Sequence, residues 1–327
     1  MRAVRRRDVL TLCSAAAAAS FVPRLAWAQA TWPSANISIV VPFTPGGLTD
    51  ILARSVGEKI APVLGKPVIV DNRPGAGGAI GATAVARSAP DGHTLLLGHI
   101  GILAVNPSLY ANLQYDPMTF FYIALLAIVP NVIVVHPSVP VHSIRELIDY
   151  AKANPNKLNF SSAGTGGAAH IAMAAFIVAA GIEMTHVPYR GTPQSVGDVI
   201  SGQVQLTFTS GVSLLPHVRA GTLRALGVST RNRLSIAPEI PAIAETLPGF
   251  DLSAWYGIVG PSGLPEPIVR RLHEEIRRAM AAPDIGRRLN TEGAVHWDVS
   301  PEEFRGYVVA ETQRWKSVIE SAKIKIE

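Results

Sequence analysis

Val-Val-Pro-Phe-Thr-Pro-Gly-Gly-Leu-Thr-Asp, residues 40–50, is the stretch that decides the fold of this chain. The β-branched run Ile37–Val41 predicts a buried strand, and the helix-compatible run Leu48–Ile60 follows directly after the two glycines. Adjacent glycines let backbone N–H groups point outward without interference from Cβ atoms, and the first helical turn adds further unpaired N–H groups. Such a corner suits a carboxylate or phosphate. Because any tight strand-to-helix turn favours glycine, the corner taken alone slightly favours an ordinary turn.

The rest of the chain alternates strands with helices. Further strands are predicted at residues 68–70, 94–97, 132–135, 158–161, 184–187, 204–208 and 224–228. Helices are predicted at residues 49–63, 80–89, 144–153, 168–180, 193–201, 214–220 and 268–281, with a last helix opening at Ser300. This alternation predicts an α/β protein with a mainly parallel sheet covered by helices on both faces.

Two positions are candidate crossings between domains. They are Pro130-Asn131 and the aromatic stretch Ser253–Gly257, and a self-contained set of βα units lies between them. We therefore expect one lobe from residues 29–130 plus 254–327 and a second lobe from residues 131–253, with a cleft between them. The apolar segment Phe120–Val135 has 16 residues, fewer than the ~20 of a membrane span, so Val132–Val135 is predicted as a buried strand after a break. We expect no membrane insertion of the mature chain.

Residues 1–28 have the pattern of an export signal. Arginines at positions 5–7 precede the apolar stretch 11–22, and Ala26-Trp27-Ala28 predicts cleavage after Ala28. A twin-arginine signal and an ordinary Sec signal both fit, and either one directs the mature protein to the periplasm. The leader carries +4 of the net charge of +5 and the only cysteine, Cys13. The mature chain is therefore nearly neutral, with no indication of a nucleic-acid partner, and has no thiol or disulfide.

Cofactor and catalytic motifs find little support. Residues 71–81 contain glycines spaced G-x-G-x-x-x-G, one residue longer than a dinucleotide fingerprint, and Asp71 precedes them instead of following about 20 residues later. A structural turn is the favoured interpretation, and we expect no cofactor. No G-x-S-x-G motif occurs, and His273-Glu274 lacks the second histidine of a zinc motif, so we expect neither an enzyme nor a metal site.

A second strand–glycine loop–helix corner lies at Ser161–His170. It repeats the geometry of residues 40–50, and its small hydroxyl side chains beside exposed N–H groups suit carboxylate oxygens. Two such corners that face each other across a cleft would form a binding site that neither makes alone. His170 itself is predicted to have a core or capping role on the helix.

In its ordered motifs the chain resembles the Bug-type periplasmic solute receptors of tripartite tricarboxylate transporters. The resemblance covers essentially the whole mature length. Its landmarks are Pro42–Gly47 with Asp50, Asn72–Gly78, Pro90–Leu96, Asn106–Tyr110, Tyr115–Pro117, Ser162–Gly164, His186–Gly191, and Pro248–Phe250 before Trp255.

The resemblance implies a two-lobed binding protein, type II-like, that closes like a Venus flytrap and has no catalysis. The two loops act in that family as pincers on a small carboxylate, partly through ordered water. Carried over by position, the ligand-binding residues are Phe43, Thr44, Pro45, Gly46, Gly47 and Asp50, facing Ser162, Ala163, Gly164, Thr165 and Tyr189. Asp50 either accepts a hydrogen bond from the ligand or complements the positive end of the helix, and the second is favoured as its constant role. The expected partners are membrane permease subunits, with the receptor itself a monomer.

Two positions depart from the family pattern. His99 stands in Gly98–Gly101 where relatives often carry small hydroxyl residues, and Thr209 stands where many carry an aspartate. We add both to the predicted site, because His99 suits an anionic or aromatic ligand and Thr209 removes a negative charge. Among organic acids, aromatic carboxylates and acidic amino acids, these changes disfavour the amino acids. An orphan sensor for a signalling partner and a periplasmic enzyme on small acids or esters are the alternative functions.

Overall fold

The computed structural model describes residues 32–291 and 293–322, so the predicted export signal lies outside the described residues. The strands are β1 (Ile37–Val41), β2 (Val68–Asn72), β3 (Thr94–His99), β4 (Phe121–Val135), β5 (Asn159–Ser162), β6 (Thr185–Pro188), β7 (Leu206–Ser210), β8 (Arg224–Val228) and β9 (Ser253–Gly260). The helices are α2 (Leu48–Leu64), α3 (Ala79–Ala86), α4 (Asn106–Leu109), α5 (Ile144–Ala153), α6 (Ala168–Ala180), α7 (Thr192–Ile200), α8 (Gly211–Arg219), α9 (Glu266–Met280), α10 (Pro283–Thr291) and α11 (Pro301–Ala322).

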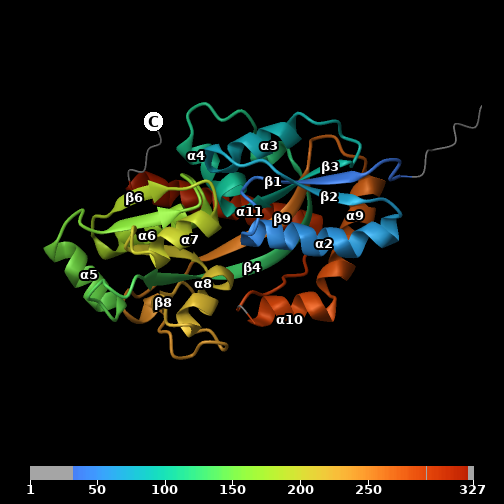
Figure 1. Cartoon of the computed structure of the whole chain (residues 1–327). Coiled ribbons are helices and arrows are strands. Elements are labelled where there is room, and N and C mark those ends of the chain that lie inside the picture. The colour runs from blue at the N-terminus through green and yellow to red at the C-terminus, as the bar shows by residue number, and fades with distance from the viewer. Residues whose placement is uncertain (1–31, 292, 323–327) are drawn as a thin grey trace, which may run out of the picture.

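The strands form one curled sheet in the order β2-β1-β3-β9-β4-β7-β5-β6, with β8 also paired to β4. Figure 1 shows two lobes side by side, with β4 and β9 running from one toward the other. The predicted parallel pairing is present within each lobe, where β1 pairs with β2 and β3, and β5 pairs with β6 and β7. The other pairs, all involving β4 or β9, are antiparallel, which makes each lobe a mixed sheet. The predicted two-lobed α/β architecture is confirmed.

Strand β4 changes its partners between Pro130 and Asn131. Up to Pro130 it pairs with β9, and from Asn131 onward it pairs with β7. The predicted break before Val132 is therefore wrong: β4 runs through Pro130 without interruption. Proline has no backbone N–H to donate. It is tolerated here because β4 changes its partner strand at this point, so no continuous ladder of hydrogen bonds is interrupted. The next N–H, that of Asn131, donates to Oγ of Ser229 at 2.9 Å. The exact residue boundaries of the lobes stay a prediction.

Two further elements differ from the sequence-based expectations. The stretch predicted only as a crossing, Ser253–Gly257, is the first part of strand β9, whose residues are buried from Ala254 onward. No helix was predicted directly after residues 268–281, but α10 begins there, with Pro283 as its first residue. A proline fits the first position of a helix because the N–H it lacks would have no intrahelical partner there. Phe120–Val135 forms sheet rather than a membrane span, and none of the helices in residues 32–291 and 293–322 has the length and apolarity to cross a bilayer.

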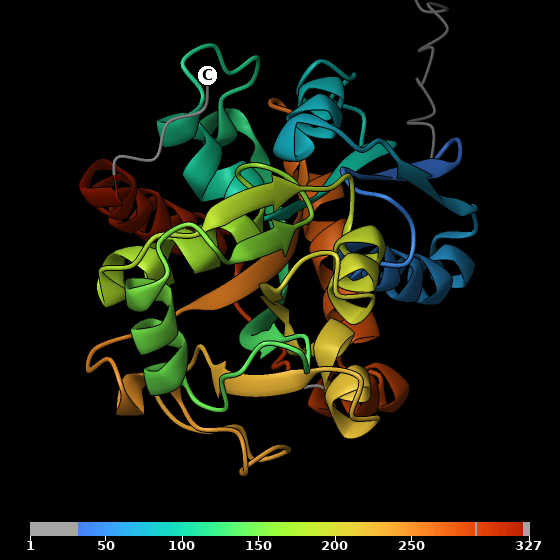
Figure 2. The same ribbon diagram turned by 60° about the vertical axis from the view of Figure 1, so that its left-hand side comes forward.

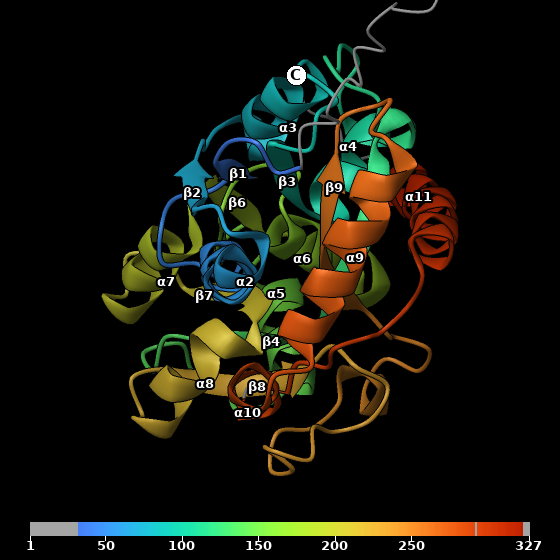
Figure 3. The same ribbon diagram turned by 90° about the vertical axis from the view of Figure 1, so that its right-hand side faces the viewer.

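The helices cover the sheet and join the two lobes. Helices α2 and α9 pack together on one side of the first lobe, while α11 packs against β4, the π-helical turn Gly101–Val105 and α6 (Figure 3). Glu311 of α11 is buried, and its Oε2 accepts hydrogen bonds from Nε1 of both Trp255 and Trp315, each at 3.1 Å. The long C-terminal helix is thereby fixed to β9 by a buried polar cluster within an otherwise apolar core.

Candidate functional site

The two corners predicted from the sequence enclose one cavity. Its lining comes from both lobes and consists of Phe43, Leu48, Thr49, His99, Ala163, Gly167, Ala168, Ala169, Thr192, Thr209, Ser210, Ser213 and Tyr256. The cavity is therefore an interlobe site in which neither lobe supplies the whole lining.

Four helices begin at this cavity. Leu48 opens α2, Ala168 opens α6, Thr192 opens α7, and Ser210 caps α8 by accepting the N–H of Val212. The first N–H groups of a helix have no partner inside it, and they carry the positive end of the helix dipole. No lysine, arginine, aspartate or glutamate is among the residues that line the cavity. Among the lining residues, partial positive charge is therefore supplied by the backbone at the helix starts and by no charged side chain.

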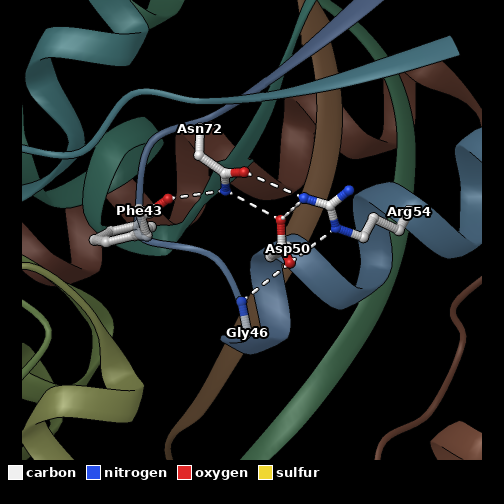
Figure 4. Close-up of polar contacts among 5 residues, drawn as sticks. All are labelled: Phe43, Gly46, Asp50, Arg54 and Asn72. Carbon is white, nitrogen blue, oxygen red and sulfur yellow. Dashed lines mark hydrogen bonds and ion pairs between the residues drawn. The ribbon is translucent and has the colours of Figure 1, made fainter.

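Asp50 holds the first loop in place. Its carboxylate accepts hydrogen bonds from the backbone N–H of Gly46, from Nε and Nη2 of Arg54, and from Nδ2 of Asn72, all at 3.0 Å (Figure 4). Asn72 also donates to the carbonyl oxygen of Phe43 at 3.0 Å. Burial alone would raise the pKa of Asp50, but the hydrogen bonds outweigh it and keep the pKa below its usual value. With its oxygens engaged and outside the cavity lining, Asp50 acts on the loop geometry.

Two stacked histidines, His170 buried and His186 partly buried, hold the second loop. Nε2 of His186 lies 2.6 Å from Oγ of Ser162, and the N–H of Gly166 donates to Nδ1 of His170 at 3.1 Å. The two imidazole rings are stacked, with centroids 4.0 Å apart. Burial lowers the pKa of both rings, to about 4 for His170 and about 3 for His186. The predicted core role of His170 is confirmed. Ser162 supports the loop and does not line the cavity.

His99 lines the cavity and has one buried polar atom without a hydrogen-bond partner in the protein. Its side chain is buried between Phe43 and Tyr256, with ring centroids 4.9 Å and 6.2 Å away. Nδ1 accepts the N–H of Gly101 at 2.8 Å, whereas Nε2 is buried and has no hydrogen-bond partner in the protein. Burial lowers the pKa of His99 to about 3, so the ring is neutral at neutral pH. A neutral imidazole that accepts at Nδ1 carries its proton on Nε2.

The tip of the first loop packs against the second lobe. A Cβ atom on Gly46 would lie 3.6 Å from Cγ of Pro193, and one on Gly47 would lie 3.6 Å from Oγ1 of Thr192. In Figure 2 the blue segment after β1 runs beside the yellow helix α7, in agreement with these distances. Thr44 fits against the backbone of Gly191, at a point where any side chain on Gly191 would collide with it. The structure therefore represents a closed arrangement of the two lobes at this edge.

The predicted site residues divide into those that line the cavity and those that surround it. Phe43, Ala163, His99 and Thr209 line it. Gly164, Thr165 and Tyr189 line an adjoining groove that also contains the turn Pro74–Gly78, with Phe43 and Ala163 standing between the two spaces. Thr44, Pro45, Gly46, Gly47, Asp50 and Ser162 line neither space, and they shape or support the loops.

Several lining residues were not predicted. They are Leu48, Thr49, Gly167, Ala168, Ala169, Thr192, Ser210, Ser213 and Tyr256. Leu48 and Ala168 follow the glycine loops directly, so the rule that unpaired N–H groups lie at helix starts was sufficient to include them. Thr192 and Ser213 lie at the starts of helices whose proximity to the first loop depends on the tertiary structure. In the described part of the chain, no cluster of three or more His, Cys, Asp or Glu side chains is arranged to hold a metal ion.

Comparison with known proteins gives consistent results. The family model described as the tripartite tricarboxylate transporter family receptor matches residues 52–324. A Pseudomonas relative, the UPF0065 protein in the tcbD-tcbE intergenic region, is 39% identical over 291 residues, which cover 88% of this chain and 86% of that protein.

Solved structures show the same fold. The periplasmic binding protein BugD has a TM-score of 0.86 and 34% identity, and the match covers 90% of this chain and all of BugD. A protein from R. palustris solved with adipate gives the same values, a TM-score of 0.86, 34% identity, and coverage of 90% and 100%. MatC from Rhodopseudomonas palustris, solved with bound malate, has a TM-score of 0.85 and 33% identity, with 88% of this chain and 100% of MatC covered.

Proposed function

This chain belongs to the tripartite tricarboxylate transporter receptor family, and on that premise we propose that it captures a small carboxylate in the interlobe cavity. We further propose that it acts in the periplasm and delivers the ligand to membrane permease subunits for uptake. The observation that carries the proposal is the convergence of four helix N-termini on a cavity without a cationic side chain.

A carboxylate fits this environment for electrostatic reasons. Moving an anion out of water is unfavourable unless hydrogen bonds and opposite charge replace its hydration. Unpaired N–H groups at helix starts provide both, and each supplies a fixed donor that needs no reorganisation. The hydroxyl groups of Thr49, Thr192, Thr209 and Ser213 add further donors around the cavity. The adipate and malate in the two related structures agree with a carboxylate as the class of ligand.

The position of the helices explains how a ligand would close the receptor. Helix α2 belongs to the first lobe, whereas α6, α7 and α8 belong to the second. An anion contacts all four helix starts only when the lobes are together, so it binds the closed state more tightly than an open one. Closing would bend β4 and β9 where they pass from one lobe to the other, near Pro130 and Ser253, which lie opposite each other. The ligand would therefore stabilise a shape that a permease can recognise.

The proposal is tested by removing and replacing ligand on the mature chain that begins at Gln29. The protein is unfolded and refolded to release any bound acid, and its thermal midpoint is measured with malate, adipate and their uncharged diamides. We expect acids to raise the midpoint and diamides to leave it unchanged, because only the acids supply negative charge. Native mass spectrometry of protein that has not been refolded should detect a small acid. Equal shifts with acids and diamides, or no response to any acid and no bound acid, would contradict the proposal.

Delivery to a permease needs a separate test. Cells that lack this receptor should lose uptake of the radiolabelled acid found above, and expression of the wild-type chain should restore it. Normal uptake in the deleted strain would refute the transport role and favour the sensor alternative.

A further inference from the structure

One side chain that lines the cavity has a buried donor without a partner in the protein. His99 is among the residues that line the cavity, and its Nε2 is buried and makes no hydrogen bond, whereas Nδ1 of the same ring accepts the N–H of Gly101. A buried donor left without an acceptor costs about 1–3 kcal/mol. A ligand that places an acceptor against Nε2 recovers this loss, and a ligand without one does not.

The surroundings of His99 keep it a donor. Phe43 and Tyr256 flank the ring, and no acidic or basic side chain is present in the cavity lining to stabilise a charged imidazolium. Because the backbone N–H of Gly101 occupies Nδ1, the proton of the neutral ring stays on Nε2. His99 therefore offers one donor in a fixed direction over the physiological pH range.

The same surroundings oppose a ligand with an ammonium group. No carboxylate lines the cavity, and the oxygens of Asp50 are taken by Gly46, Arg54 and Asn72. An ammonium group here would lie among positive helix ends and beside an N–H donor, with no acceptor side chain of opposite charge. The cavity thus supplies donors in excess and lacks a partner for a cation.

We propose that His99 is the specificity-determining residue of the cavity, and that it selects carboxylic acids which carry a further oxygen acceptor and no ammonium group. The proposal rests on the proposed function and specifies the class of ligand. The carboxylate lies at the helix starts, and a hydroxyl, carbonyl or second carboxylate oxygen accepts the Nε2–H of His99. Acids that carry only a hydrocarbon chain bind more weakly, and amino acids of the same shape are rejected.

The test uses matched ligands and matched variants. 4-Oxopentanoate and pentanoate differ by one carbonyl oxygen, and malate and aspartate differ by a hydroxyl against an ammonium group. His99→Asn retains an acceptor for the N–H of Gly101 but lacks the Nε2 donor, whereas His99→Phe lacks both. Calorimetry on the refolded wild type should show tighter binding of the oxo acid than of pentanoate, by about fivefold to tenfold, as expected for one hydrogen bond. Malate should bind and aspartate should not.

In His99→Asn the preference for 4-oxopentanoate over pentanoate should fall to about one. An unchanged preference, or tight binding of aspartate by the wild type, would overturn the proposal while leaving carboxylate capture intact. Failure of every acid to bind would refute carboxylate capture together with this inference. If His99→Asn does not fold, the Nε2–H signal of wild-type His99 is followed by proton–nitrogen NMR. A shift with 4-oxopentanoate and none with pentanoate supports the proposal, and equal behaviour contradicts it.

Discussion

The carbonyl oxygen of Thr165 lies where a side chain on Gly77 would be. Gly77 belongs to the turn after β2 in the first lobe, and Thr165 to the loop after β5 in the second. The hydroxyl of Tyr110 donates to the same carbonyl oxygen at 3.3 Å. The two lobes therefore meet backbone to backbone beside the cavity, and only a glycine permits this approach.

Gly77→Ala should weaken ligand binding at least tenfold, because the added methyl group keeps the lobes from closing fully. Gly77 also has a positive φ of 58°, so alanine adds backbone strain of about 1–2 kcal/mol. Gly181→Ala is the matched control, since Gly181 has φ of 61° and open space where its Cβ would stand. Calorimetry measures the ligand affinity of both variants, and thermal unfolding measures their stability, which separates incomplete closure from backbone strain. Equal losses of affinity in the two variants would show that strain alone is responsible.

Ala168→Pro should weaken carboxylate binding about fivefold to tenfold without unfolding the protein. Proline fits the first position of α6, and the extended conformation of Gly167 (φ −69°, ψ 160°) is suitable before it, so the main change is one lost N–H donor. Ala168→Val adds the same number of carbon atoms and keeps the N–H. Isothermal titration with the best-bound acid compares the two variants. Weaker binding by the valine variant than by the proline variant would assign the effect to volume.

Asp50→Asn should destabilise the protein by about 1–2 kcal/mol and also reduce ligand affinity, because the asparagine cannot accept from all of the donors that fix the loop. Arg54→Gln should cost at most about 1 kcal/mol, since the Arg54 side chain is 54% exposed and its ion pair is screened by water. Urea unfolding measures both. A larger loss for Arg54→Gln would mean that the ion pair, and not the bond to Gly46, positions the loop.

Stability should fall as the pH is lowered below about 6.5. His99, His170 and His186 have pKa values lowered by burial, so the unfolded chain binds more protons than the folded one between the unfolded value of 6.5 and the folded values of about 3 to 4. Their contribution is complete above pH 6.5 and is lost as the pH falls through this window. Each of the three histidines is expected to lower the free energy of unfolding by about 1.5 kcal/mol between pH 6.5 and 5.

Urea midpoints at pH 8, 6.5, 5.5 and 5 measure this dependence. In His186→Asn the free energy of unfolding should fall less steeply below pH 6.5, because only two of the three histidines still contribute. If the free energy of unfolding falls equally steeply in His186→Asn and in the wild type, His186 becomes protonated without loss of the folded loop.

Glu311→Leu should destabilise the fold by about 2–5 kcal/mol, because it leaves the indole N–H groups of both Trp255 and Trp315 buried without an acceptor. Glu311→Gln retains one carbonyl oxygen near the indoles and should cost less. Chemical unfolding followed by tryptophan fluorescence gives both values. Similar stability of the leucine variant and the wild type would mean that water replaces the carboxylate.

Much of the local structure follows from the sequence. The capping residues Ser143 and Glu146 predict the start of α5. The N–H of Glu146 donates to Ser143 Oγ at 3.1 Å as expected, whereas Glu146 Oε2 accepts the N–H of His142, one residue before the N-cap, at 2.7 Å. The bounds of α5, α6 and β8 also agree with the prediction. These features depend on residues within one or two turns of each other, so a linear pattern contains the necessary information.

The sequence by itself determined the alternation of strands and helices, the two glycine corners and the family. Only the tertiary structure decided that four helix starts share one cavity, that Asp50 serves the loop, and that His99 presents an unpaired donor. The continuity of β4 through Pro130 was decided in the same way, by the partner strands on each side. The physical reason is range: hydrogen bonds within a helical turn or capping motif are written into neighbouring residues. Burial, pairing and the electrostatic potential of a cavity, by contrast, depend on segments brought together from across the chain.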